Sequence, residues 1–185
     1  MKQLTRCKTR DAAFPFRMGA GFPGDVNRTH PAEIEAALIS VATPPTAYGQ
    51  AVKVAAGNSV RPFAVADASD AVDDIAFGAT VRPYPMQPST ATNYGATAFG
   101  AATPPVSGVI DVARSALILV QLNTGVAAPV KGGRVYLWCA ATAGNHIQGG
   151  YETEFSAGNT VRLDGRFTYN GPADASGVVE LSCNV

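Results

Sequence analysis

The sequence predicts an all-β protein with a single β-barrel or jelly-roll-like sandwich as its body and an extended arm at its N-terminus. Two apolar runs, residues 116–122 and 134–141, are rich in β-branched and aromatic side chains and short for helices. The 19 Gly and 13 Pro are spread over 185 residues and divide the chain into short segments. Residues 1–45 show no core pattern, and five prolines interrupt them.

In the body, residues 46–185, turn signals separate nine or ten short strands. Gly57-Asn58 is a two-residue hairpin turn, because both residues tolerate positive φ. Gly78 indicates a bulge in a strand over residues 75–84. The two apolar runs are expected to be antiparallel neighbours at the centre of the core. The other expected strands are residues 50–55, 59–65, 109–112, 151–155, 160–163, 166–169 and 178–183, at the spacing of a sandwich or barrel.

The arm, residues 1–45, is the most basic part of the chain. Alternation of Ile34, Ala36 and Leu38 favours a strand over residues 30–39, although Pro31 would also suit the first turn of a short helix. Such an arm gains order by lying on a neighbouring subunit, often as an added strand. The alternatives are an arm that packs on its own domain or stays disordered. The long loop at residues 86–107 is expected to be functional or to pack on a partner.

Composition restricts the class of partner. Charged residues make up 15% of the chain and the formal net charge is zero, whereas about 25% charged residues is usual for a soluble domain. Part of the surface is therefore covered by small side chains or by a partner. Basic residues form no cluster, so direct nucleic-acid binding is not expected. The sequence has neither a signal peptide nor an apolar run of the ~18 residues that span a membrane, and the protein is expected to be made in the cytoplasm with no membrane partner.

Sequence motifs give little support for a cofactor or a metal. Residues 19–24 match the letters GxGxxG, but Pro23 lies inside them and no strand precedes them. Acidic side chains gather at residues 67–74, but their spacing is three rather than the two of a calcium loop. This cluster consists of Asp67, Asp70, Asp73 and Asp74. We expect a solvated loop, with a weak divalent site as the alternative.

Catalytic residues are not expected either. The two histidines, His30 and His146, lie before a proline and in a Gly-rich turn, and no GxSxG nucleophile motif is present. The three cysteines form no CxxC pair. Cys139 and Cys183 lie in expected strands and are expected to be buried thiols, with a disulfide between them as the alternative.

One ordered set of blocks resembles a known family. The segment Phe22-Pro23-Gly24-Asp25-Val26-Asn27-Arg28-Thr29-His30-Pro31 is similar to the arm signature of the structural cement proteins, which are capsid decoration or minor capsid proteins of tailed bacteriophages. That family often has an aromatic residue after the His-Pro pair, where this chain has Ala32. Further similar blocks, in order over residues 20–185, are residues 46–52, 81–87, 129–133, 148–150 and 170–174.

The resemblance implies a virion protein on the outer capsid surface. It would bind the major capsid protein across capsomer boundaries as a homodimer or homotrimer and stabilise the head. Arg17 and Arg28 would pair with coat carboxylates, and Phe22 would fill an apolar groove. Removal of residues 1–30 would abolish capsid binding and leave the body folded. The candidate capsid-binding residues are Phe14, Phe16, Arg17, Phe22, Asp25, Arg28, His30, Ile34, Leu38, Tyr94 and Phe99.

Two other function classes stay open on the sequence. The first is a β-domain associated with a tail, baseplate or fibre, which would recognise glycans through Tyr94, Phe99 and Tyr151. The second is an enzyme that uses His146 and nearby acids. Neither has a motif of its own, so no catalytic residue and no cofactor is assigned.

Overall fold

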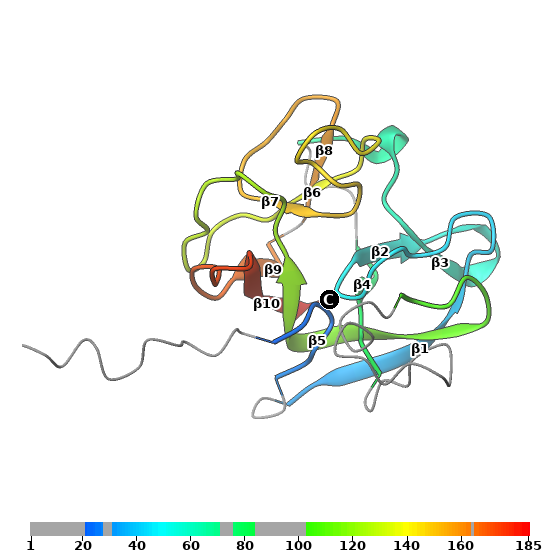
Figure 1. Ribbon diagram of the computed structural model, residues 1–185. Helices are drawn as coiled ribbons and strands as arrows, with labels where there is room; N and C mark the ends of the chain where they lie inside the picture. The colour runs from blue at the N-terminus through cyan, green and yellow to red at the C-terminus, as the bar shows by residue number, and fades with distance from the viewer. Residues whose placement is uncertain (1–20, 28–30, 71–75, 84–102, 164) are drawn as a thin grey trace, which may run out of the picture.

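The computed structural model describes residues 21–27, 31–70, 76–83, 103–163 and 165–185. These residues form ten strands, seven in one sheet and three in another, with two short 3-10 turns (Figure 1). The all-β prediction is confirmed. The larger sheet contains β1 (Glu33–Ile39), β2 (Ala51–Val54), β3 (Ser59–Pro62), β4 (Gly78–Thr80), β5 (Val109–Gln121), β9 (Phe167–Tyr169) and β10 (Val178–Asn184). The smaller contains β6 (Tyr136–Trp138), β7 (Tyr151–Glu152) and β8 (Thr160–Arg162), and the turns are η1 (Ala56–Asn58) and η2 (Val65–Asp67).

Strand β5 is the central strand of the molecule. In its first half, Ala113 pairs with both Ile34 of β1 and Ala79 of β4. In its second half, Ile118 pairs with Leu181 of β10 and, through an isolated bridge, with Val26. A strand residue has one neighbour on each side, so β5 is flanked on both sides in each half. The expected strands at residues 109–112 and 116–122 are therefore one continuous strand of 13 residues.

The first half of β5 closes a small barrel. The pairings run β1–β3–β2–β4–β5 and return from β5 to β1, so each of these five strands has a neighbour on both sides. Alternate side chains point inward, among them Ile39, Val60 and Val112. A hairpin joins β2 to β3 as predicted, but its loop spans residues 55–58 rather than the expected two residues, and positive φ at Gly57 and Asn58, 78° and 58°, turns the chain within it. Closure leaves the ring without a free sheet edge.

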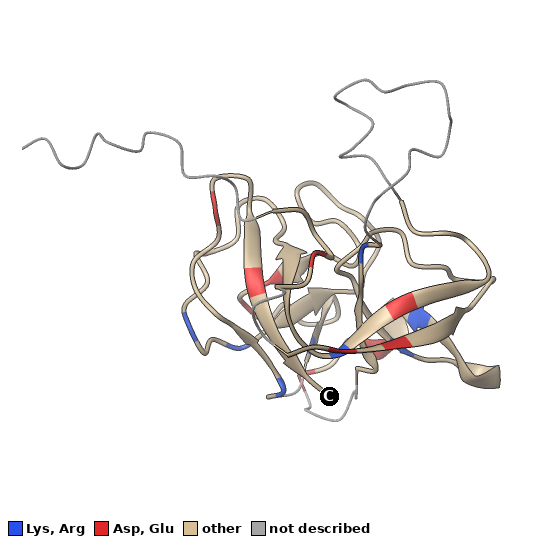
Figure 2. Ribbon diagram, turned by 90° about the horizontal axis from the view of Figure 1, so that it is seen from below, with Lys and Arg blue, Asp and Glu red and all other residues tan. Residues whose placement is uncertain are grey.

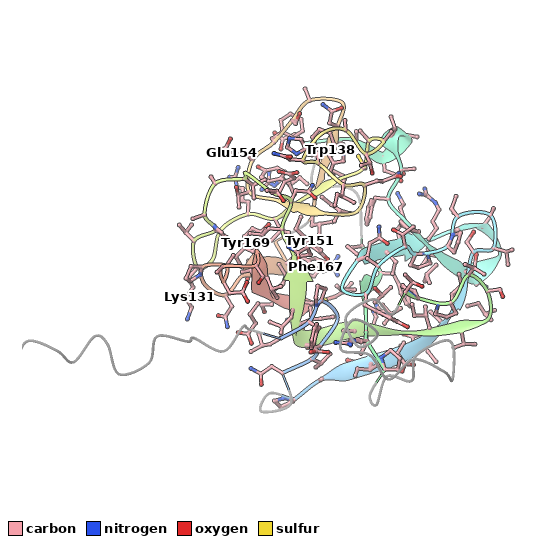
Figure 3. All side chains as sticks on the ribbon, in the orientation of Figure 1. Lys131, Trp138, Tyr151, Glu154, Phe167 and Tyr169 are labelled. Atoms are coloured by element: carbon pink, nitrogen blue, oxygen red, sulfur yellow. The ribbon has the colours of Figure 1, made fainter. Side chains whose placement is uncertain are left out.

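The second half of β5 carries the larger core. It packs with β9, β10 and the three-stranded sheet around buried residues that include Leu137, Tyr151, Phe167 and Tyr169 (Figure 3). The hydroxyls of Tyr151 and Tyr169 donate to the carbonyl oxygens of Gly49 and Glu152, at 2.8 and 2.7 Å. Burial raises the pKa of both tyrosines, so both stay protonated donors. Their hydrogen bonds therefore satisfy the polar atoms of this core.

Cys139 and Cys183 are buried, and no disulfide joins them. Cys139 follows β6 and Cys183 lies in β10, and each sulfur contacts a backbone carbonyl oxygen. The prediction of buried thiols is confirmed, and the alternative disulfide between them is not formed.

The predicted pairing of the two apolar runs is wrong. The run at residues 116–122 pairs with β10, and the run at 134–141 contributes β6 to the smaller sheet. All seven residues of β10 pair with residues 115–121 of β5, whereas β6 has only three residues. The longer ladder satisfies more backbone groups, and the connection between the runs contains Pro129 and is too long for a tight hairpin.

Gly78 is not the predicted bulge but a point of close backbone approach. A Cβ at this position would lie 2.3 Å from the Ala113 carbonyl oxygen and 2.6 Å from Val112 Cγ1. Glycine is therefore needed for β4 to pair with β5 at this distance.

The substitution Gly78→Ala is expected to destabilise the protein by about 2 kcal/mol or more, because the added methyl group forces β4 away from β5. Urea unfolding checks this. Gly171→Ala is the matched control, because a Cβ there has open space around it. Equal unfolding midpoints for the two variants would contradict the close approach.

The described part of the predicted arm lies on the chain's own strands. Strand β1 pairs with β5 and β3, which confirms the strand alternative for residues 33–39 of the predicted segment. Upstream, Gly24 N donates to Leu119 O at 2.7 Å, and Leu119 N donates to Asp25 O at 2.9 Å. These segments are ordered by the chain itself, so the expectation that they gain order only on a neighbour is wrong for them.

One residue of the acidic cluster, Asp67, forms ion pairs with Arg61 and Lys53. Asp67 accepts hydrogen bonds from Arg61 at 2.8 Å, from Lys53 at 3.0 Å and from the Ala64 backbone at 2.8 Å. Asp70 is exposed, and Asp73 and Asp74 lie outside the described residues. Burial alone raises the pKa of Asp67, but the hydrogen bonds from Arg61, Ala64 and Lys53 outweigh it and lower the pKa to about 2. Within the described ranges, no three His, Cys, Asp or Glu side chains are placed to hold a metal ion.

The ion pairs of Asp67 predict a pH dependence of stability. Because the folded pKa of about 2 lies below the ordinary 3.8, the stabilisation is present above pH ~4 and is lost as the pH falls toward 2. It amounts to about 2 kcal/mol. Asp67→Asn should remove this part of the acid sensitivity, and Asp70→Asn, an exposed control, should not. Urea unfolding across this pH range measures both, and identical pH profiles for Asp67→Asn and the unsubstituted chain would contradict the assignment.

Candidate binding surface

Phe22 and Asp25 form a fixed turn that presents an aromatic ring. The Phe22 backbone N–H donates to Asp25 Oδ2 at 3.0 Å, and the Arg82 guanidinium lies 4.3 Å from the centre of the Phe22 ring. Gly24 has φ +88°, and a Cβ there would lie 2.6 Å from Tyr48 Cβ, so the turn requires glycine. The Phe22 side chain is nevertheless 48% exposed. The turn therefore holds an apolar ring at the surface.

Strand β1 exposes apolar side chains on its outward face. Ala37 and Ile39 are buried, so the alternate residues Ile34 and Leu38 point outward, where they are 46% and 56% exposed. Leu38 pairs across the sheet with Val109 of β5, which is 55% exposed. Cross-strand partners share a face of the sheet. We call Ile34, Leu38 and Val109 the apolar strip.

Charge on the strip is sparse and acidic. Asp111 is exposed and pairs with Ala36, so it lies on the same face between Ile34 and Leu38. Figure 2 shows the molecule from below, with few coloured positions on mainly tan strands. On the opposite face of β1, Glu35 pairs with Arg114 at 2.9 Å, and this guanidinium lies 4.2 Å from the Phe77 ring centre. These contacts help to hold β1 against the barrel.

The structure places the predicted residues in two groups along β5. Asp25 binds Leu119 near one end of this strand, and Leu38 pairs with Val109 at the other. The sequence did not predict Val109 as a surface residue beside Leu38, because the pairing of β1 with β5 could not be identified from the residues. The remaining candidates lie outside the described residues: Phe14, Phe16, Arg17, Arg28, His30, Tyr94 and Phe99.

Tyr151 and His146, which the glycan-binding and enzyme hypotheses would use, both contact other side chains or backbone groups of the chain. Tyr151 is 1% exposed, so it is not available to bind a glycan. His146 stacks on Trp138 with ring centres 4.3 Å apart, and its Nδ1 lies 2.7 Å from Glu152 Oε1. The sequence did not indicate this pairing, since no motif links the two residues.

Comparison with known proteins identifies the family of the chain. The model of the XM1 gp53 minor capsid protein family matches residues 12–183, nearly the whole chain. The chain belongs to this family. The family membership confirms the phage minor capsid resemblance and, with it, a place in the virion.

A solved structure supports the fold of this minor capsid protein. A chain of "The capsid of Myoviridae Phage XM1" is similar with a TM-score of 0.63, and the match covers 96% of this chain and 98% of that chain. The sequences are 14% identical, so this likeness concerns the fold. No curated protein matches the sequence. Among the described residues, no helix is long and apolar enough to cross a membrane.

Proposed function

We propose that this minor capsid protein is a capsid cement protein. It binds the outer surface of the major capsid protein across capsomer boundaries and stabilises the head. The observation that carries the proposal is the apolar strip, because Ile34, Leu38 and Val109 point away from the core of a closed barrel. Each of these side chains is about half exposed, so its complete burial in an interface stabilises a complex by about 1 kcal/mol.

Charge complementarity specifies the opposing coat surface. Asp111 lies within the strip face, and a buried carboxylate without a cation is unfavourable. The coat surface is therefore apolar with a Lys or Arg side chain opposite Asp111. Phe22, held over Arg82 by its turn, provides a second apolar contact near the other end of β5.

Each contact is modest, so several act together. Engagement of more than one coat subunit makes the second contact intramolecular and raises the overall affinity without any stronger single contact. Copies arranged as homodimers or homotrimers add to this effect. The head is thereby reinforced at the boundaries between capsomers.

Heads purified without this protein test the proposal. The purified chain should co-sediment with such heads to a fixed stoichiometry and raise the temperature at which they release DNA. Isolated tails serve as the second target. Binding to tails without binding to heads would overturn the cement function and favour a tail, baseplate or fibre role.

A further inference from the structure

A cavity on the three-stranded sheet lies apart from the apolar strip. Its volume is about 260 Å³, and residues of the β7–β8 connection and a loop at residues 125–127 form its walls. Two aromatic side chains, Trp138 and Phe155, and two carboxylates, Glu152 and Glu154, line it together with His146. Figure 3 labels Trp138 and Glu154 at the same end of the molecule. None of the described lining residues is Lys or Arg, so the cavity is acidic when His146 is neutral.

Glu152 is a buried carboxylate that faces this cavity. Only 6% of its side chain is exposed. Its Oε1 accepts hydrogen bonds from Asn123 Nδ2 at 2.6 Å and His146 Nδ1 at 2.7 Å, so His146 carries its proton on Nδ1. Both of these hydrogen bonds engage Oε1, and none to Oε2 is found among the described residues, so Oε2 stays open to water or to a ligand in the cavity. A buried carboxylate with unused acceptor capacity favours a cationic donor.

The carboxylate is fixed before any ligand arrives. Asn123 is 5% exposed, and its Oδ1 accepts the Ile147 backbone N–H at 3.1 Å. A Cβ at Gly150 would lie 2.0 Å from Asn123 Oδ1, so only glycine leaves room for this side chain. These contacts hold the Glu152 carboxylate in place through Oε1, so the side chain has little freedom to lose on binding.

We infer that this cavity binds a cation, the guanidinium or ammonium group of an Arg or Lys side chain of a partner chain. Glu152 and Glu154 supply charge, and the ring of Phe155, which is 41% exposed, supplies an aromatic face of the kind that a cation prefers. A planar guanidinium can donate to Glu152 Oε2 and Glu154 together. The inference does not rest on the proposed function, since the same side chain can come from a coat subunit or from a second copy of this chain.

Methylguanidinium and methylurea test the inference on the isolated protein, because they share their shape and differ in charge. NMR titration at low ionic strength should show that methylguanidinium shifts the Trp138 indole resonance and that methylurea does not. Equal binding of the two compounds, or no shift with either, would overturn the inference. A methyl glycoside serves as the third probe, and binding of it alone would make the cavity a carbohydrate site instead.

Substitutions of single glutamates test whether methylguanidinium binds in this cavity. Glu154 is exposed, so Glu154→Gln should leave the fold intact and weaken methylguanidinium binding about threefold. Glu33→Gln, which removes an equal charge from exposed β1, is the matched control and should bind normally. Glu152→Gln should weaken binding about tenfold or more. Equal affinities of the Glu154→Gln and Glu33→Gln variants would contradict the site.

Two further measurements on Glu154→Gln distinguish the source of the cation. Weaker binding to heads with unchanged self-association identifies a coat side chain. Weaker self-association with unchanged binding to heads identifies a second copy. Unchanged binding in both measurements would show that no partner side chain uses the cavity.

Discussion

A chain that carries Ile34→Glu and Leu38→Glu is expected to lose binding to phage heads and to keep its fold. Both side chains point away from the barrel core and are about half exposed, so the substitutions remove no core packing. In the complex, each change removes an apolar contact and places a carboxylate in an apolar interface. The lost contact and the buried carboxylate together cost at least about 1.4 kcal/mol at each position, so the affinity should fall at least about 100-fold.

Two exposed valines provide matched controls. Val65 and Val130 are 54% and 68% exposed and lie outside the strip, in η2 and in the loop before β6. Glutamate at these positions changes the charge equally and should leave binding to heads unchanged. Co-sedimentation with heads measures all variants, and circular dichroism confirms their fold. Normal binding by the strip variant would rule out the strip as the coat-facing surface.

Deletions of residues 1–20 and 1–30 are expected to give different proteins. The longer deletion removes residues 24–27, whose backbone bonds to Leu117, Leu119 and Arg82 are 2.7–2.9 Å long. Loss of these bonds should destabilise the body by about 3 kcal/mol or more and expose an edge of β5 to aggregation. The shorter deletion removes none of these bonds. Thermal unfolding should therefore show a larger decrease in Tm for the longer deletion than for the shorter one.

The backbone bonds of residues 24–27 lead us to expect the opposite of the sequence-based prediction that removal of residues 1–30 leaves the body folded. That truncation cannot separate a role in capsid binding from a role in folding. The deletion of residues 1–20 does so, since it removes the candidates Phe14, Phe16 and Arg17. It should weaken binding to heads and keep the backbone bonds of residues 24–27 to the body. Equal Tm values for both deletions would contradict the pairing of residues 24–27 with β5.

Features of the fold with local causes were predictable from the sequence. Gly57-Asn58 specifies its hairpin through positive φ, and alternation places β1 and β10 at the expected residues. Partner choice was not predictable, because it depends on residues far apart in the chain. Residues 116–122 pair with β10 near the C-terminus rather than with the next apolar run. The role of Gly78 was also not predictable, because the backbone that leaves no room for a Cβ there belongs to the distant strand β5.

Only part of the candidate surface was predictable, because a local pattern can be read from the sequence and a distant strand partner cannot. Alternation identified Ile34 and Leu38, and the structure adds Val109 because β1 and β5 are neighbours. The acidic cavity had no signal in the sequence. Asn123, His146 and Glu152 are spread over three segments, and only the fold brings them into hydrogen-bond contact.

Electron cryomicroscopy of heads decorated with this protein tests the cement function and its surface together. We expect each copy to lie on the outer face of the coat at a boundary between capsomers. Ile34, Leu38 and Val109 should be buried against the major capsid protein, with a basic coat side chain beside Asp111. Copies that leave these residues in solvent, or that occur on the tail and not on the head, would contradict the account.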